Sequence, residues 1–336
     1  MKRRWMVLGP VILLGVMLLC VCVGSASIAP GDALGVLWDA LLGRESAPGV
    51  PRSVILFVRL PRVLCVALVG ASLSGCGCAM QGLLKNPLAD GSTLGVSSGA
   101  SLGAVLAIAF GIVLPGLPFA GTMVMASVFA FGSLLLTLGL AYRLDHTLST
   151  NTIILVGVIF SMFASSLMSL VITFAGEKVK TITFWTMGSL SGSSYQNAAA
   201  LALAFALGFA ALMLRARELN AFALGEDNAR HVGVDVKRVK LTVLVASSLL
   251  IGACVSVGGT IGFVGLVMPH MMRMLVGPNH VRLLPASALG GAVFLLLCDL
   301  VARTLLSPVE LPVGVVTSLI GAVVFVQIFA RTRKGG

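Results

Sequence analysis

The feature that most constrains this chain is a series of apolar stretches, each close to the length that crosses a lipid bilayer. A membrane-spanning helix needs about 20 consecutive apolar residues. By that rule the sequence predicts ten spans, at residues 7–26, 62–82, 93–112, 119–141, 152–174, 196–214, 240–257, 262–277, 284–303 and 311–330. The third and eighth are short or interrupted by glycine. We therefore predict an all-α, polytopic membrane protein whose residues 1–336 form one transmembrane domain.

Composition supports this class and excludes others. Hydrophobic residues make up 58% of the chain and charged residues only 10%, whereas soluble domains are about 25% charged. The net charge of +11 could suggest a nucleic-acid partner. However, the basic residues lie in short loops between apolar runs, without the clustering that nucleic-acid binding requires. The expected environment is a lipid bilayer, with no nucleic acid.

The distribution of basic residues predicts the orientation of the chain. The N-terminal segment is similar to a signal peptide, but its apolar run from Trp5 to Val23 is long enough to span, so we interpret it as an uncleaved first helix. With ten spans, 16 of the 23 basic residues fall on the side of the N-terminus and 7 on the other side. The positive-inside rule then places both termini in the cytoplasm.

A short motif occurs twice, on opposite predicted sides of the membrane. The segment Gly91-Ser-Thr-Leu-Gly95 precedes the third span, and Gly258-Gly-Thr-Ile-Gly262 precedes the eighth. Inverted repeats of this kind are common in transporters. The glycines Gly258, Gly259, Gly262 and Gly265 have two open interpretations. They either allow close helix packing or form a flexible, broken helix that lines a path.

One long polar segment, residues 215–240, interrupts the apolar pattern on the predicted cytoplasmic side. It carries six basic and four acidic residues, and Gly225 and Gly233 divide it into short helices, with Asp235 as a candidate N-cap. It could be a solvated loop, a helix on lipid headgroups, or a docking element for a cytosolic protein. The mixed charge favours docking over attraction to anionic lipid.

Ionisable residues within the spans are few. Asp299 and Arg303 are four residues apart on one helix and can pair, and Glu310 precedes the last span. A chain of buried carboxylates is missing, which disfavours a proton- or sodium-driven carrier. The sequence also contains no Walker A motif and no recognisable catalytic motif. The seven cysteines lack metal-ligand spacing, so we expect no metal site. Because catalytic and nucleotide-binding motifs are also missing, we expect no cofactor and no enzymatic activity in this chain.

The chain resembles the permease subunits of type II ABC importers, the FecCD-like group that takes up iron-siderophore complexes, haem and cobalamin. The resemblance covers nearly the whole chain. The stretches that carry it are Arg59-Leu-Pro-Arg62, Gln81 to Asp90, Leu94-Gly-Val-Ser-Ser-Gly99-Ala, Trp185-x-Met-Gly188, Gly259-Thr-Ile-Gly-Phe-Val-Gly265-Leu, Pro269-His-x-x-Arg273 and Glu310-Leu-Pro-Val-Gly314.

The resemblance implies an importer in the bacterial inner membrane, built from two permease subunits, either a homodimer or paired homologues. Two cytoplasmic ATPase subunits would supply the energy, and an extracytoplasmic binding protein would deliver the cargo. The expected cargo is a ferric siderophore, with haem or cobalamin as alternatives. The fifth and tenth spans would line most of the path.

Three groups of residues acquire roles from this resemblance. The contact with the ATPase corresponds to Gly225, Glu226, Asp227, Arg230, His231 and Gly233. The docking site for the binding protein corresponds to Arg59, Arg62 and Arg303. The inner gate, in the loop between the fourth and fifth spans, corresponds to Leu148, Ser149, Thr150 and Asn151.

Overall fold

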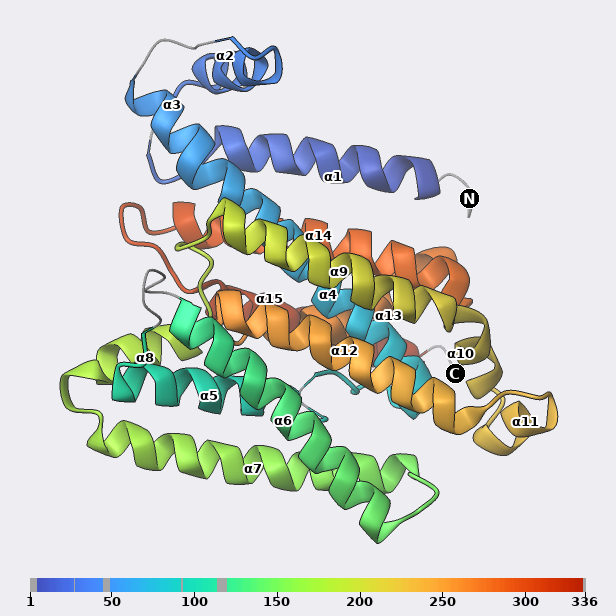
Figure 1. The fold of residues 1–336 in the computed structure, drawn as a ribbon. Helices are drawn as coiled ribbons and strands as arrows, with labels where there is room; N and C mark the ends of the chain where they lie inside the picture. Colours follow the sequence, from blue (N-terminus) through green and yellow to red (C-terminus); the bar gives the residue numbers. More distant parts are fainter. Residues whose placement is uncertain (1–4, 27, 45–48, 92, 114–119, 335–336) are drawn as a thin grey trace.

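The computed structural model describes residues 5–26, 28–44, 49–91, 93–113 and 120–334, and over these ranges it contains helices and no strands (Figure 1). This confirms the all-α prediction. Each predicted span falls on a helix: α1 (Trp5–Cys22), α4 (Leu60–Leu84), α5 (Val96–Phe110), α6 (Ala120–Leu144), α7 (Thr150–Phe174), α9 (Tyr195–Leu214), α12 (Val236–Gly258), α13 (Val264–Val276), α14 (His280–Thr304) and α15 (Val313–Lys334).

The ten helices differ in length. Six of them are long and apolar enough to cross a membrane, among the described residues, including a continuous helix over Pro51–Leu84 in which α3 (Val50–Val54) and a π-helical turn (Ile55–Arg59) lead into α4. The 15 residues of α5 and the 13 of α13 reach only about 20 Å, less than the ~30 Å hydrocarbon core. These are the third and eighth predicted spans, and each follows a non-helical segment.

Short helices cover the two ends of the bundle. The helices α2 (Pro30–Leu41), α3 and α8 (Val179–Thr186), with the turn η2 (Gly176–Lys178), lie at one end. The helices α10 (Ala216–Phe222) and α11 (Glu226–His231) lie at the other end, together with the α6–α7 turn, the start of α1 and the end of α15 (Figure 1). We call the latter the inner end, following the charge distribution; Lys2, Arg3 and Arg4 lie outside the described residues.

The helix α4 lies at the centre of the bundle, and most of its residues are buried. It packs on α9, α12, α13 and α14. Glycines allow two of these contacts to be made backbone to backbone. A Cβ added to Gly70 would lie 2.3 Å from the carbonyl oxygen of Gly291 on α14. One added to Gly77 would lie 1.9 Å from the carbonyl oxygen of Gly265 on α13. Small residues at such positions are what membrane helices use to approach closely.

Substitution of Gly77 by alanine should therefore destabilise the protein, because the new methyl group would overlap the α13 backbone and force the helices apart. Overpacking of this kind costs about 1–3 kcal/mol or more. The matched control is Gly132→Ala on α6, where an added Cβ would meet no atom within 4 Å. Thermal unfolding in detergent should show a lower midpoint for Gly77→Ala only; equal midpoints would contradict the packing described here.

Candidate functional site

The polar segment 215–240 folds as its glycines predict. Gly225, with φ +115°, separates α10 from α11, and Gly233, with φ +86°, follows α11. Both angles lie in the region that favours glycine. The side chain of Asp235 then accepts a hydrogen bond from the Arg238 backbone N–H at 3.0 Å and begins α12. The two short helices and the N-cap of the following span are confirmed.

This segment has one buried and one exposed face. Leu219, Phe222 and Ala229 are fully buried, which fixes α10 and α11 to the inner end of the bundle. Of the residues expected to contact an ATPase, Asp227, Arg230, His231 and Gly233 are exposed, whereas Gly225 and Glu226 are half-buried. Two exposed apolar side chains, Leu224 (69%) and Val232 (68%), extend the same surface. The sequence analysis did not identify them, because it judged the surface of this segment by its charged residues.

The α6–α7 turn contains the expected gate residues and is held by one carboxylate. Asp145 accepts hydrogen bonds from the backbone N–H and hydroxyl of Thr147, at 2.8 and 2.6 Å, and from the Ser149 N–H at 3.0 Å. These donors, led by the Thr147 hydroxyl, hold the pKa of Asp145 well below its usual range, so the carboxylate stays charged at any physiological pH.

The remaining gate residues begin α7. The Ser149 hydroxyl accepts from the Thr152 N–H at 3.4 Å and caps the helix, while Thr150 is half-buried and Asn151 is exposed. Leu148 precedes them in the left-handed region, with φ +52°, and its side chain is buried. This backbone turns the Leu148 carbonyl toward α12, where it accepts a hydrogen bond from the side chain of Lys240.

The structure brings the predicted coupling segment and the predicted gate together through Lys240. Its ammonium lies 2.7 Å from the Glu226 carboxylate on α11 and donates to the Leu148 carbonyl at 2.8 Å. Glu226 also accepts a hydrogen bond from the Thr150 hydroxyl at 3.1 Å. The sequence analysis counted Lys240 among the loop cations and assigned it no role. Its position inside an apolar run, between Val239 and Leu241, was the available signal.

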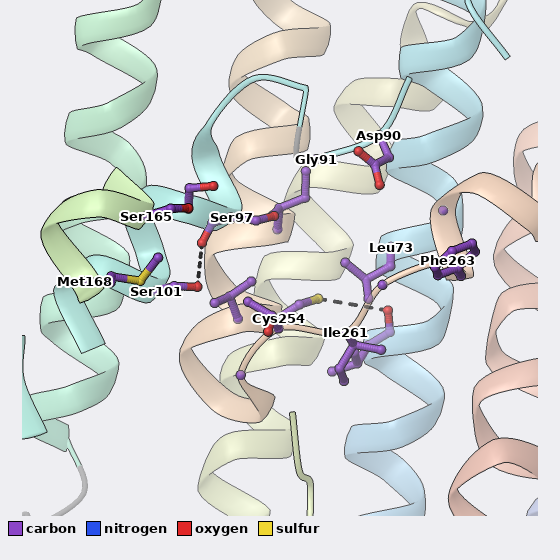
Figure 2. A pocket seen from close by; sticks show the side chains of 18 residues that line it. Leu73, Asp90, Gly91, Ser97, Ser101, Ser165, Met168, Cys254, Ile261 and Phe263 are labelled. Carbon is purple, nitrogen blue, oxygen red and sulfur yellow. Dashed lines mark hydrogen bonds between the residues drawn. The ribbon is translucent and has the colours of Figure 1, made fainter. Parts of the chain in front are cut away.

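A cavity of about 310 Å³ lies between α4, α5, α7, α12 and the segment that precedes α13. Serine hydroxyls from two helices face it: Ser97 and Ser101 from α5, and Ser165 from α7 (Figure 2). Asp90 is its one carboxylate, and no Lys, Arg or His is among its described lining residues. Leu73, Met168, Cys254 and Ile261 form much of the apolar remainder.

The four glycines expected either to pack helices or to line a path lie from the end of α12 to the start of α13. Gly265 packs on the α4 backbone, whereas an added Cβ at Gly262 would meet only Ser318, at 3.8 Å, and both line the cavity. Gly258 ends α12, and Gly259, with φ +68°, turns the chain away from it.

The non-helical segment that follows is tied to the end of α8. The Thr260 hydroxyl donates to the Thr186 carbonyl. The Ser189 N–H donates to the Gly258 carbonyl at 2.9 Å. The Gly258 carbonyl at the break is thus satisfied by protein, as membrane depth requires.

The three arginines expected to dock a binding protein lie at the outer end and are buried, at 3%, 6% and 2% exposure for Arg59, Arg62 and Arg303. Arg62 donates to Asp299 at 3.0 and 2.9 Å and to Glu310 at 2.8 Å. Arg303 lies 3.3 Å from Asp299, which confirms the pair expected from their spacing.

Arg59 completes this outer charge cluster by donating to backbone carbonyls at the end of α1, those of Val21 and Cys22. All three guanidinium groups are thus engaged within the chain rather than presented at the surface. Isolated buried charges are costly, so arginines at this depth are held by carboxylates and carbonyls. Their role in docking stays a prediction.

Removal of the central carboxylate should unfold this cluster. Asp299→Ala leaves two buried guanidinium groups without their common partner, and breaking a buried ion pair costs about 3–5 kcal/mol. Glu218→Ala is the control, because it removes one partner of a half-exposed pair, Arg215 to Glu218 at 3.2 Å, worth about 0–1 kcal/mol. Chemical or thermal unfolding in detergent measures both; equal losses would show that the cluster contributes no more than a surface pair.

The fold and these sites define a class of protein. The chain is a bundle of membrane helices in which two spans are broken and a hydroxyl-lined cavity lies beside one of them. At the inner end, an exposed polar segment is joined to a turn. This architecture is typical of a membrane transport subunit.

Comparison with known proteins places the chain within that class. The FecCD transport family matches residues 12–331, so the chain belongs to this family and is an ABC importer permease. It is 43% identical over 315 residues to the uncharacterized ABC transporter permease protein YvrB of Bacillus subtilis, with 93% of this chain and 89% of YvrB covered.

Two further relatives carry names that state different cargoes. The cobalamin import system permease protein BtuC of Halobacterium salinarum is 39% identical, covering 89% of this chain and 81% of its own. The molybdate import system permease protein MolB of Haemophilus influenzae is 37% identical, covering 97% of both.

A solved structure shares the fold. It is an inward-facing conformation of a chain assigned to the metal-chelate type of ABC transporter. It superposes with a TM-score of 0.78 at 35% identity and covers 90% of this chain and 98% of its own.

Proposed function

We propose that this chain is the permease of an inner-membrane importer that moves an iron complex, such as a ferric siderophore, into the cytoplasm. A separate ATPase subunit hydrolyses ATP at the inner end, and a binding protein delivers the cargo at the outer end. Residues 1–336 act as a single permease domain, with both termini in the cytoplasm.

The observation that carries this proposal is the exposed surface of α11 and its flanks. Asp227, Arg230 and His231 are exposed beside Leu224 and Val232, at the end of the bundle that also holds the α6–α7 turn (Figure 1). Large apolar side chains mixed with both signs of charge suit a protein partner better than lipid headgroups or water alone. An ATPase that binds here can move the inner end of the transmembrane domain.

The lining of the cavity between α4, α5, α7 and α12 supports a chelate rather than a small oxyanion as cargo. Recognition of an oxyanion such as molybdate uses arginine, lysine or clustered N–H donors. The described lining holds serine hydroxyls, one carboxylate and apolar side chains, and no cation. A bulky complex that carries its metal inside an organic ligand needs only weak, polar and apolar contacts along a path. Haem and cobalamin share this property and are the alternative cargoes.

We further propose that a second copy of the chain covers the exposed apolar faces of α7 and α15. On α7, Leu155, Ile159, Met162 and Phe163 are exposed, and on α15 Leu319 and Val323. A pair of subunits that meets along these helices would enclose the path between them.

Substitution of Asp227 by alanine should weaken coupling to the ATPase while the permease stays folded, because this side chain is exposed at the start of α11. We expect ATP hydrolysis stimulated by the binding protein to fall by about tenfold. Glu177→Ala, an exposed carboxylate at the outer end, should leave hydrolysis unchanged. Stimulated hydrolysis that is equal in the two variants would count against docking at α11.

The cargo is tested by uptake into proteoliposomes that contain the permease, its ATPase and its binding protein. A ferric hydroxamate siderophore, haemin, cyanocobalamin and molybdate are supplied in turn, with and without ATP. ATP-dependent uptake of the siderophore is the expected result. Uptake of molybdate alone would overturn the argument from the cavity lining, and uptake of haemin or cyanocobalamin alone would assign the alternative cargo.

A further inference from the structure

Lys240 occupies a position that the proposed transport cycle does not yet explain. Its residue exposure is 0%, and it is the only lysine among the buried side chains of the described residues. A buried ammonium requires partners that compensate for lost hydration. Here the partners come from two separate parts of the inner end: the Glu226 carboxylate on α11, at 2.7 Å, and the Leu148 carbonyl in the α6–α7 turn, at 2.8 Å.

Each partner is itself fixed to one of these parts. Glu226 is the first residue of α11, whose next turn is anchored by the buried Ala229. Leu148 belongs to the turn that Asp145 holds together through Thr147 and Ser149. The turn and α11 are therefore each held by contacts of their own, and the Lys240 ammonium is in contact with both.

A second link runs directly between the two parts. The Thr150 hydroxyl, on the first residue of α7, donates to the same Glu226 oxygen that contacts Lys240. One carboxylate oxygen thus receives a hydrogen bond from the gate and an ion pair from α12. Charge-assisted hydrogen bonds are stronger and shorter than neutral ones, so the carboxylate and the ammonium define the geometry of the contact.

We propose that Lys240, Glu226 and Thr150 form a joint that makes the inner gate follow the ATPase-contacting helix α11. Lys240 acts as a positioning residue: it touches neither cargo nor ATPase, and it holds the α6–α7 turn at a fixed distance from α11. Displacement of α11 then displaces the carbonyl of Leu148 and the start of α7. This inference rests on the proposed function for its role in transport, but the mechanical link exists in the permease alone.

The link is tested first in the full-length permease in nanodiscs. Spin labels are attached at His146→Cys, in the α6–α7 turn, and His231→Cys, at the end of α11; both positions are exposed. The unsubstituted chain, labelled in parallel, gives the background from its seven native cysteines, of which six are buried. The distance distribution between the labels should be narrow. Lys240→Met, which keeps an unbranched apolar side chain one atom shorter and removes the ammonium, should broaden this distribution.

Two variants complete this measurement. Arg238→Met removes a basic residue from the same turn of α12 but at an exposed position, and should leave the distribution narrow. Thr150→Val removes only the direct link to Glu226 without removing any charge, and should broaden the distribution less than Lys240→Met. This milder variant serves if Lys240→Met fails to fold. An unchanged distribution in Thr150→Val and in any folded Lys240→Met would overturn the proposal.

The second measurement places the joint in the transport cycle. In the complete importer, Lys240→Met should lower ATP-driven uptake by about tenfold while stimulated hydrolysis stays within about twofold of the unsubstituted complex. A merely structural residue would lower both together. If the unsubstituted complex shows no ATP-driven uptake, the proposed function fails and the spin-label result still judges the joint. If uptake is present and unaffected by Lys240→Met, the joint has no part in gating.

Discussion

The structure depends on backbone contact between α4 and its neighbours. In a membrane, apolar side chains gain little by leaving lipid for protein, so helices associate through close packing and polar contacts instead. At Gly70 and Gly77 the absence of a side chain lets α4 touch the backbones of α14 and α13. The second of these contacts fixes Gly265, and with it the end of the broken segment that borders the central cavity. The close packing of α4 on α13 therefore holds one wall of this cavity in place.

The positions of the helices could be predicted from the sequence because hydropathy acts over whole spans and does not require knowledge of neighbours. The helix breaks at Gly225 and Gly233 and the N-cap at Asp235 could be predicted equally well, because the local backbone geometry favours those residue types. The ends of the helices were harder to predict. The helix that contains α4 begins at Pro51 and includes Arg59 and Arg62, two charges that normally mark the end of a span. They are tolerated there because carbonyls and carboxylates from elsewhere in the chain accept their hydrogen bonds.

The relations between distant segments could not be predicted. The sequence analysis placed Glu226 in the coupling segment and Thr150 in the gate from a family resemblance, but nothing in one sequence shows that they meet. The Thr150 hydroxyl donates to Glu226 directly, and Lys240, which stands 14 residues after Glu226 and 90 after Thr150, contacts the same carboxylate oxygen. For the same reason the contact of Arg62 with Asp299 was not predicted, although the pairing of Asp299 with Arg303 was.

The burial of charged residues at both ends of the bundle changes the count of basic residues from which the orientation of this chain is inferred. The positive-inside rule counts basic residues in the loops and near the ends of the spans, and a count restricted to residues that the folded protein does not bury can be compared with it. With Arg59, Arg62 and Arg303 removed from one side and Lys240 from the other, the count of 16 against 7 becomes 15 against 4. Three of the seven basic residues on the outer side thus lie inside the folded protein. The charges left in the loops favour one orientation more strongly than the bare sequence indicates.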